Sequence, residues 1–595
     1  MQLSGIDWII ILIFFLITLV IGIMSAKKSG KNTAEFFLSG RNMPWWLLGV
    51  SMVATTFSAD TPNLVTDIIR KDGIAGNWVW WAFCLTGMLT VFVYARLWRR
   101  SEVLTDLEFY EMRYSGNIAA ILRGFRALYL GVFFNIMIMA TVLLAGIKIG
   151  SVMLGLSAIE TVLYSSIVTV LYTSLGGLRG VILTDFFQFG IAMLGIIWAA
   201  VVIVNMPEVG GLTELFNHPN VEGKLDFIPD FDNTNVLLPL FIIPLAVQWW
   251  NVWYPGAEPG GGGYVAQRML AAKNEKHAVG ATLFFNIAHY AFRPWPWILI
   301  ALASLIIFPD LDAIRTAFPN VSENVVNDDL AFSAMLTFLP RGLLGLVLAS
   351  LIAAFMSTIS THLNWGSSYI VNDFYKRFVD KNAAEKTLVN VGRISTLILM
   401  VCSGVLALAL SNALQAFNIL LQIGAGTGLI FILRWFWWRI NAYSEITAMI
   451  VSFIMAFYFE FAHDKLGFVE LESHEKLIYG ILITTAAWLI ATYASRPTSR
   501  EKLISFYKKV HPSKIGWGPV IENGLETGAL QNEEIKTGEF ALKLAAMFIA
   551  VFLVYSILFG TGYFLYGNMT NTLICVAVAV SSGLFLISVW KRLSS

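Results

Sequence analysis

The chain has 595 residues, of which 57% are hydrophobic and only 13% are charged, and its mean hydropathy is +0.69. Soluble domains carry about 25% charged residues, so this composition excludes an ordinary water-soluble protein and indicates one that resides in the lipid bilayer. The net charge of +1 gives no basic face for nucleic acid.

Apolar runs recur from one end of the chain to the other. A helix that crosses the bilayer needs roughly 20 mostly apolar residues. On this criterion the sequence predicts about fifteen spans, near residues 6–25, 44–70, 75–96, 119–150, 157–176, 181–204, 235–271, 278–308, 336–372, 389–411, 413–436, 444–462, 475–495, 539–562 and 568–590.

Basic loops lie on one side of these spans. Lys27, Lys273 and Lys376, with their basic neighbours and the stretch 496–514, follow spans of one direction. The acidic segments 208–232 and 310–329 follow spans of the other direction. Because loops rich in lysine and arginine stay in the cytoplasm, we expect a multi-pass cell-membrane protein with the N-terminus outside and the C-terminus in the cytoplasm.

Two predicted spans are interrupted at the depth of the bilayer. The first contains Ser51 to Pro62, and the second contains Trp253 to Tyr264 with two prolines and five glycines between Pro255 and Gly263. A proline or glycine can simply kink a membrane helix, an alternative that has more weight for Pro62 than for the second run. Paired interruptions in two halves of a chain indicate a transporter site between inverted repeats.

Hydroxyl side chains crowd one turn of the span at 336–372, where Ser357, Thr358, Ser360 and Thr361 stand. Such oxygens suit sodium, a hard cation, although serine and threonine also join membrane helices by packing. Asp185 stands near the start of another span, where a carboxylate is costly and needs a cation. That cation is either an ion or Arg179, six residues earlier.

Several motifs occur in order along the chain: Phe36–Trp46, Ser174–Asp185, Gln267–Lys273, Ala354–Thr358 and Asn372–Lys376. In these motifs the chain resembles the sodium:solute symporter family, which includes sodium/glucose, sodium/proline and sialic acid transporters. The resemblance implies an all-α polytopic membrane protein of the LeuT-like fold. Its core has two inverted repeats of five helices, with one extra N-terminal helix and about four extra C-terminal helices.

The implied organisation is an extra helix with its loop (1–43), a first repeat (44–204), an extracellular loop (205–234) and a second repeat (235–440). The C-terminal helices follow at 441–595, with an insertion at 495–538.

The resemblance also implies a sodium site. Its ligands are the carbonyl oxygens of Ala54, Phe57 and Ala354 and the hydroxyl oxygens of Ser357 and Thr358. A possible second sodium ion is bound by Asp185, Ser360 and Thr361. Sodium is then the coupling ion.

The expected solute contacts surround the two breaks and the tenth core helix: Asp60, Thr61, Trp80, Trp253, Glu258, Gly262 and Gln422. The sequence departs from the sugar-transporting pattern here, because Gly262, Thr61 and Trp80 stand where asparagine, glutamine and an acid are expected. Tryptophan and glycine replace those polar contacts. His289 and Arg293 are either site groups or satisfied polar residues.

The sequence therefore predicts a sodium-coupled symporter that imports a small organic solute by alternating access, with a sugar or sugar derivative favoured. An importer of an amino acid, an organic acid or a quaternary amine is the alternative. A channel or an intramembrane enzyme is a distant one, since polar groups cluster in discrete places and the histidines form no catalytic or metal motif. We expect no catalytic residues, no nucleic-acid partner and no obligate protein partner.

Overall fold

The structure is a computed structural model that describes residues 3–29, 31–251, 258–319, 321, 323, 326–409, 424, 426–532 and 540–594. Helices dominate the described residues, and no β-strand forms among them. Eleven helical stretches there are long and apolar enough to cross a membrane: Gly5–Ser25, Ile74–Ser101, Asn117–Leu154, Gly177–Val204, Glu275–Ile307, Leu343–Val379, Glu385–Ala409, Ala442–Ala462, Ser473–Ala494, Phe540–Leu565 and Met569–Trp590.

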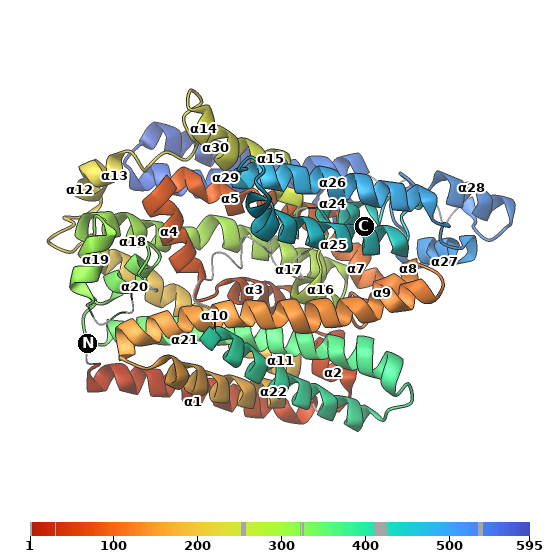
Figure 1. Cartoon of the computed structure of the whole chain (residues 1–595), viewed down its shortest axis with the longest axis horizontal. Helices are drawn as coiled ribbons and strands as arrows, with labels where there is room; N and C mark the ends of the chain where they lie inside the picture. The colour runs from red at the N-terminus through yellow and green to blue at the C-terminus, as the bar shows by residue number, and fades with distance from the viewer. Residues whose placement is uncertain are drawn as a thin grey trace.

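Most long helices run side by side along the long axis of the molecule (Figure 1). The helices of the first half of the chain, long and short, include α1 (Gly5–Ser29), α3 (Trp45–Thr56), α4 (Thr61–Asp72), α7 (Ala95–Ser101), α8 (Glu108–Arg113), α9 (Asn117–Leu128), α10 (Asn135–Ile149), α11 (Ala158–Val204), α14 (Thr234–Leu237), α15 (Ile243–Ala246), α16 (Gly263–Ala271), α17 (Glu275–Ile287) and α18 (Pro294–Ile307). In the second half they include α21 (Leu343–Ser368), α22 (Glu385–Ala409), α24 (Gly428–Leu433), α25 (Ala442–Phe457), α26 (Ser473–Ala494), α27 (Arg500–Val510), α28 (Gly518–Glu526), α29 (Phe540–Leu565) and α30 (Met569–Ser594).

The other four predicted spans correspond to shorter or interrupted elements. The span at 157–176 is the first part of α11, which turns at Gly177 with a φ of 53°. The spans at 44–70 and 235–271 are the two broken helices. Most of the span at 413–436 lies outside the described residues. Its described part contains α24.

The first break separates α3, which ends at Thr56, from α4, which begins at Thr61. Pro62 occupies the start of α4, where its missing N–H removes no helical hydrogen bond. The proline therefore starts a new helix here and does not kink a continuous one.

The second break separates α15 from α16, and residues 252–257 within it lie outside the described residues. Gly260 and Gly261 have φ angles of 87° and 86°. Only glycine adopts this region without strain. Rings from the neighbouring helices pack here, because an added Cβ on Gly260 would lie 3.1 Å from the Tyr94 ring, and one on Gly261 would lie 3.5 Å from Trp98 Nε1. These two glycines thus allow close packing.

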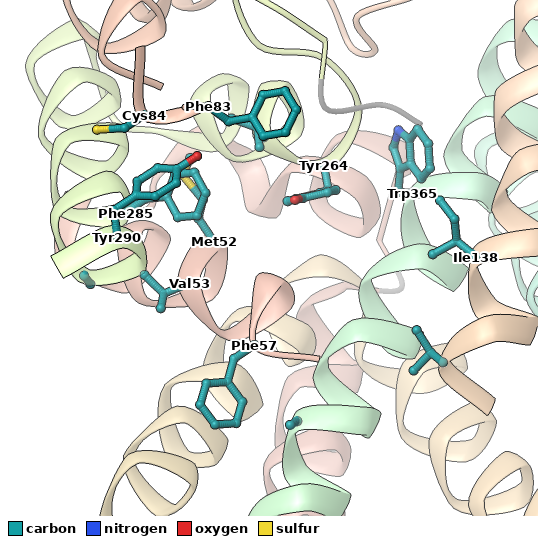
Figure 2. Packing of buried hydrophobic residues seen from close by; sticks show 14 of the residues in the cluster. Met52, Val53, Phe57, Phe83, Cys84, Ile138, Tyr264, Phe285, Tyr290 and Trp365 are labelled. Carbon is teal, nitrogen blue, oxygen red and sulfur yellow. The ribbon is translucent and has the colours of Figure 1, made fainter. Parts of the chain in front are cut away.

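Helix α11 packs closely on α21. A Cβ added to Gly195 of α11 would lie only 3.1 Å from Cβ of Ser350 in α21. Small residues let membrane helices approach in this way. On another side, Met52 and Val53 of α3 lie beside Phe285 and the neighbouring ring of Tyr290 (Figure 2).

Candidate functional site

The first break presents the carbonyl end of α3 to the middle of α21. Thr358 Oγ1 donates hydrogen bonds of 2.8 Å to the Thr55 carbonyl and 3.1 Å to the Ala354 carbonyl. The amide of Phe57 donates to the Ala54 carbonyl at 3.1 Å. Carbonyl and hydroxyl oxygens are the ligands that hard cations take. Thr358 of α21 therefore contacts the carbonyl end of α3, and the oxygens present here are of the kind that suits sodium.

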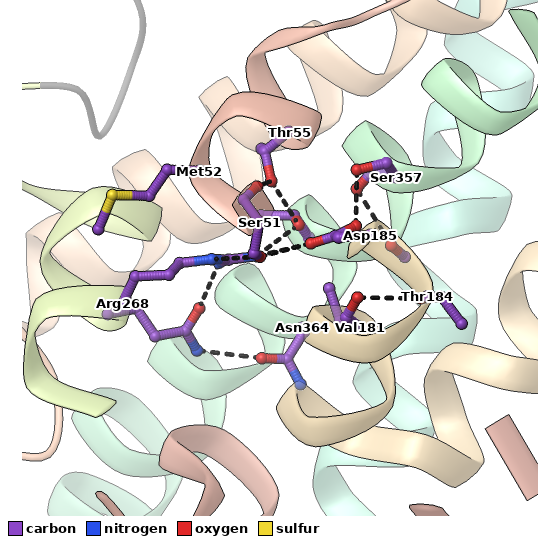
Figure 3. A network of polar contacts seen from close by, with 12 residues as sticks. Ser51, Met52, Thr55, Val181, Thr184, Asp185, Arg268, Ser357 and Asn364 are labelled. Atoms are coloured by element: carbon purple, nitrogen blue, oxygen red, sulfur yellow. Dashed lines mark hydrogen bonds and ion pairs between the residues drawn. The ribbon is translucent and has the colours of Figure 1, made fainter. Parts of the chain in front are cut away.

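Asp185 of α11 is fully buried and joins three helices. Its Oδ1 accepts a hydrogen bond of 2.6 Å from Ser357 Oγ of α21, and its Oδ2 accepts one of 2.5 Å from Ser51 Oγ of α3 (Figure 3). The carboxylate therefore lies directly beside the predicted sodium ligand Ser357.

A buried guanidinium lies beside this carboxylate. Arg268 Nη2 of α16 is 3.7 Å from Asp185 Oδ2, and both side chains are 0% exposed. Arg268 also donates hydrogen bonds to Thr361 Oγ1 at 2.7 Å and to Ser51 Oγ at 3.2 Å. The cation that faces Asp185 is thus Arg268, whereas the sequence pointed to Arg179 as the alternative to an ion.

Of the residues expected around a second sodium ion, Thr361 belongs to the network around Asp185 and Ser360 does not. Thr361 Oγ1 lies 3.0 Å from Thr55 Oγ1 and accepts from Arg268. Ser360 Oγ instead donates to the carbonyl of Ser357 at 3.0 Å, within its own helix. Asp185 and Thr361 therefore share one network with Arg268, and Ser360 bonds backwards along α21.

Two of the expected solute contacts, Asp60 and Thr61, lie at the first break. Asp60 precedes α4, and its buried Oδ1 has no hydrogen-bond partner among the described residues. Thr61 Oγ1 lies 3.5 Å from the Thr56 carbonyl. The half-buried Trp80 stacks on Tyr290, with ring centroids 5.9 Å apart.

At the second break, the carboxylate of Glu258 is engaged by two arginines. Its Oε2 lies 3.1 Å from Arg434 Nη2, and its Oε1 forms an ion pair with Arg126. Both guanidiniums also lie over the Phe431 ring. Glu258 thus ties the second break to α9 and to the end of α24. Gly262 is extended just before α16, and Trp253 and Gln422 lie outside the described residues.

A second ion-pair cluster lies between the spans, at the end of the molecule that carries α8. Glu111 accepts hydrogen bonds from Arg377 Nη2 at 2.7 Å and from Arg123 Nη1 at 2.8 Å. Burial opposes ionisation of this carboxyl, but the two guanidiniums outweigh burial and hold the pKa of Glu111 below its ordinary value.

Sequence reasoning gave no role to Ser51, Arg126, Arg268 or Arg434. The three arginines stand within apolar predicted spans, where an ionisable residue is itself a functional signal. That signal was available in the sequence. The partner of each arginine was not, because each lies in a distant segment.

Comparison with known proteins decides the family. A family model for the Sodium:solute symporter family matches residues 36–452. The chain belongs to this family. The resemblance seen in the motifs is thereby confirmed, and the chain is a sodium-coupled solute symporter of the membrane.

Relatives of this sodium:solute symporter include a sodium/glucose cotransporter of Vibrio parahaemolyticus, which is 24% identical over 84% of this chain and 91% of its own length. The sodium/myo-inositol cotransporter 2 of Oryctolagus cuniculus is 27% identical over 76% of this chain and 69% of its own length. The fold is similar to that of a Na+-coupled sialic acid symporter solved in a substrate-bound outward-open state. That match has a TM-score of 0.68 and 21% identity, and it covers 84% of this chain and 99% of the other. The expected LeuT-like fold is therefore confirmed.

Proposed function

We propose that this symporter imports a sugar or a sugar derivative with sodium, by alternating access. The meeting of the α3 carbonyl end with Thr358 of α21 carries the proposal, because it brings sodium-type oxygens together at a helix break. The sodium/glucose and sodium/myo-inositol cotransporters among the relatives support the class of solute.

The proposed first sodium site joins two structural units that alternating access must move. Its ligands are Ala54, Phe57, Ala354, Ser357 and Thr358. An ion that binds α3 and α21 together stabilises only those conformations in which the two helices are adjacent. Sodium binding then favours a conformation that is open to one side of the membrane, and this preference drives the transport cycle.

For a second ion we propose Asp185, Ser360 and Thr361 as ligands. Arg268 already neutralises Asp185 in this structure, so a sodium ion binds there only when the guanidinium has withdrawn. At about 100 mV each sodium contributes about 2.3 kcal/mol, and a tenfold gradient adds about 1.4 kcal/mol. One sodium would concentrate a neutral solute a few hundredfold, and two would approach the square of that.

The proposed solute site lies between the two breaks, within the repeats 44–204 and 235–440. Its residues are those expected from the sequence: Asp60, Thr61, Trp80, Trp253, Glu258, Gly262 and Gln422. The ion pairs of Glu258 favour a role in holding the second break over direct contact with the solute.

We also propose that the N-terminus is outside and that α27 and α28 are cytoplasmic. The start of the chain and the pair α27–α28 lie at opposite ends of the molecule (Figure 1), which supports this orientation because the basic residues lie in and around α27. The proposed cycle involves no chemical step and no obligate protein partner.

Uptake into proteoliposomes tests the proposal. We expect glucose or a sugar derivative to accumulate under an inward sodium gradient and not under an equal potassium gradient. Accumulation of proline or of a quaternary amine alone would favour the alternative solute classes. Uptake that ignores the sodium gradient for every solute would contradict symport.

A further inference from the structure

Arg293 is a buried cation near the middle of the span Glu275–Ile307. Its side chain is 1% exposed, and the residue follows a π-helical turn, Ala288–Phe292, an irregularity that is frequent at functional sites. Its Nη1 donates a hydrogen bond of 3.1 Å to Thr56 Oγ1, the last residue before the first break. Arg293 therefore reaches the break at which the sodium ligands gather.

Among the described residues, no carboxylate forms an ion pair with this guanidinium. In the described part of the chain, no aspartate or glutamate oxygen lies within 4.0 Å of Arg293, and its Nε has no hydrogen-bond partner there. The undescribed segments of the two neighbouring spans, 252–257 and 410–423, contain no aspartate or glutamate in their sequence. Because an unpaired charge inside a membrane is costly, an anion from outside the chain is the natural partner.

Two aromatic rings and one acidic side chain surround Arg293. The guanidinium lies over Trp297, 4.9 Å from the ring centroid, and over Phe57 at 5.9 Å. The nearest acid that acts on it electrostatically is Asp60, which does not pair with it and keeps a buried oxygen without a partner. An unpaired guanidinium and an unpaired carboxylate oxygen thus flank one break. Together they match a ligand with a carboxylate at one end and hydroxyl donors at the other.

We infer that the solute is a hydroxylated carboxylic acid, such as a sugar acid, and that Arg293 binds its carboxylate while Asp60 accepts hydrogen bonds from its hydroxyls. The inference rests on the proposed sodium symport and narrows its class of solute. It also assigns a solute contact on α17–α18 that lies outside the expected set.

The position of Arg293 couples the acid to sodium. Thr56, which Arg293 contacts, stands between the proposed sodium ligands Ala54 and Phe57 in sequence. An unpaired guanidinium there repels sodium, and a bound carboxylate removes that repulsion. Since coupling between two ligands is reciprocal, sodium raises the affinity for the acid by the same factor.

Uptake of matched neutral and acidic solutes tests the inference. Uptake by proteoliposomes that contain the full chain would be measured for two neutral solutes, glucose and myo-inositol. It would be compared with uptake of three acidic solutes, glucuronate, gluconate and N-acetylneuraminate. We expect sodium-dependent uptake of at least one acid, with a kcat/KM well above that of the neutral solutes. Arg293→Gln should lower that kcat/KM by roughly 10- to 100-fold, the loss expected when a charged hydrogen-bonding partner is removed. Arg293→Lys should lose less, because the charge remains.

The half-saturating sodium concentration provides a readout that a purely structural role would not change. In the wild type the acid should lower this concentration, and in Arg293→Gln it should not. Arg315→Gln, which removes an exposed arginine, is the matched control and should behave as wild type. Sodium-dependent uptake of a neutral solute with no uptake of any acid would overturn the inference and leave symport intact. An acid uptake that Arg293→Gln leaves unchanged would also overturn it. Sodium-independent uptake of every solute would instead overturn the proposed function.

Discussion

Arg268 and Asp185 face each other with 3.7 Å between Nη2 and Oδ2, and neither side chain is exposed. They come from two different helices, Arg268 from α16 and Asp185 from α11. Ser51 connects them, since it accepts from Arg268 Nε and donates to Asp185. The pair therefore joins the second broken helix to the first and to α11, and its electrostatics bear directly on the number of sodium ions carried.

The Asp185–Arg268 pair predicts non-additive mutant effects. Asp185→Asn alone and Arg268→Gln alone each leave a buried charge without its partner, which costs about 3–5 kcal/mol. The double variant removes both charges and should be more stable than the sum of the single changes implies. Thermal unfolding in detergent checks this, and additive losses would show that the two charges do not interact.

The second sodium ion predicts a change in stoichiometry. If Asp185 binds an ion during the cycle, Asp185→Asn should lower the number of sodium ions carried per solute from two to one. Paired fluxes of labelled sodium and solute measure this ratio. An unchanged ratio, in protein that still transports, would remove Asp185 from the ion ligands and leave it as the partner of Arg268 alone.

If the hydroxyls of α21 bind sodium, we expect their removal to lower the affinity for sodium. Ser357→Ala and Thr358→Ala should each raise the half-saturating sodium concentration about tenfold, since each removes one ligand or hydrogen bond worth about 1–2 kcal/mol. Ser350→Ala is a matched control, because Ser350 is also buried on α21 but, among the described residues, its hydroxyl donates only to the Val347 carbonyl. Equal effects of the control and the site variants would indicate general damage to the helix.

The carboxylate of Glu258 predicts a stability defect at the second break. Glu258→Gln leaves the guanidiniums of Arg126 and Arg434 without this acid, so we expect a loss of about 3–5 kcal/mol of stability. The melting temperature in detergent should fall clearly, with or without solute. A change in KM with an unaltered melting temperature would instead assign Glu258 to direct solute binding.

From the ion pairs of Glu111 we expect the folded protein to lose stability at acidic pH. Its folded pKa is depressed, so its ion pairs contribute full stability above the ordinary carboxyl pKa of 4.5, and this contribution is lost as the pH falls through the lower folded value. Melting temperatures of wild type and Glu111→Gln should therefore differ at pH 7 and converge below about pH 4.5. A constant difference across that range would contradict the assignment.

Several elements followed from the sequence because their cause is local. Apolar length determines each crossing helix, and eleven of the predicted spans appear as long helices. Pro62 and the glycines around Gly261 interrupt the backbone wherever they stand, so both breaks were predictable. The hydroxyl side chains of the Ala354–Thr358 motif, which suit sodium, are likewise visible in a short stretch of sequence.

The partners of the charged residues followed only from the tertiary structure. Nothing near Asp185 in sequence indicates Arg268, 83 positions later, and the nearer Arg179 was the natural but mistaken alternative. Glu258 is likewise separated from Arg126 and Arg434 by long stretches of chain. Electrostatic pairing depends on distance in space, which close packing of helices such as α11 and α21 determines. The sequence by itself thus determined a broken-helix sodium symporter in the membrane. Only the tertiary structure decided that Asp185 already has a cation and that Arg293 forms no ion pair within the described part of the chain.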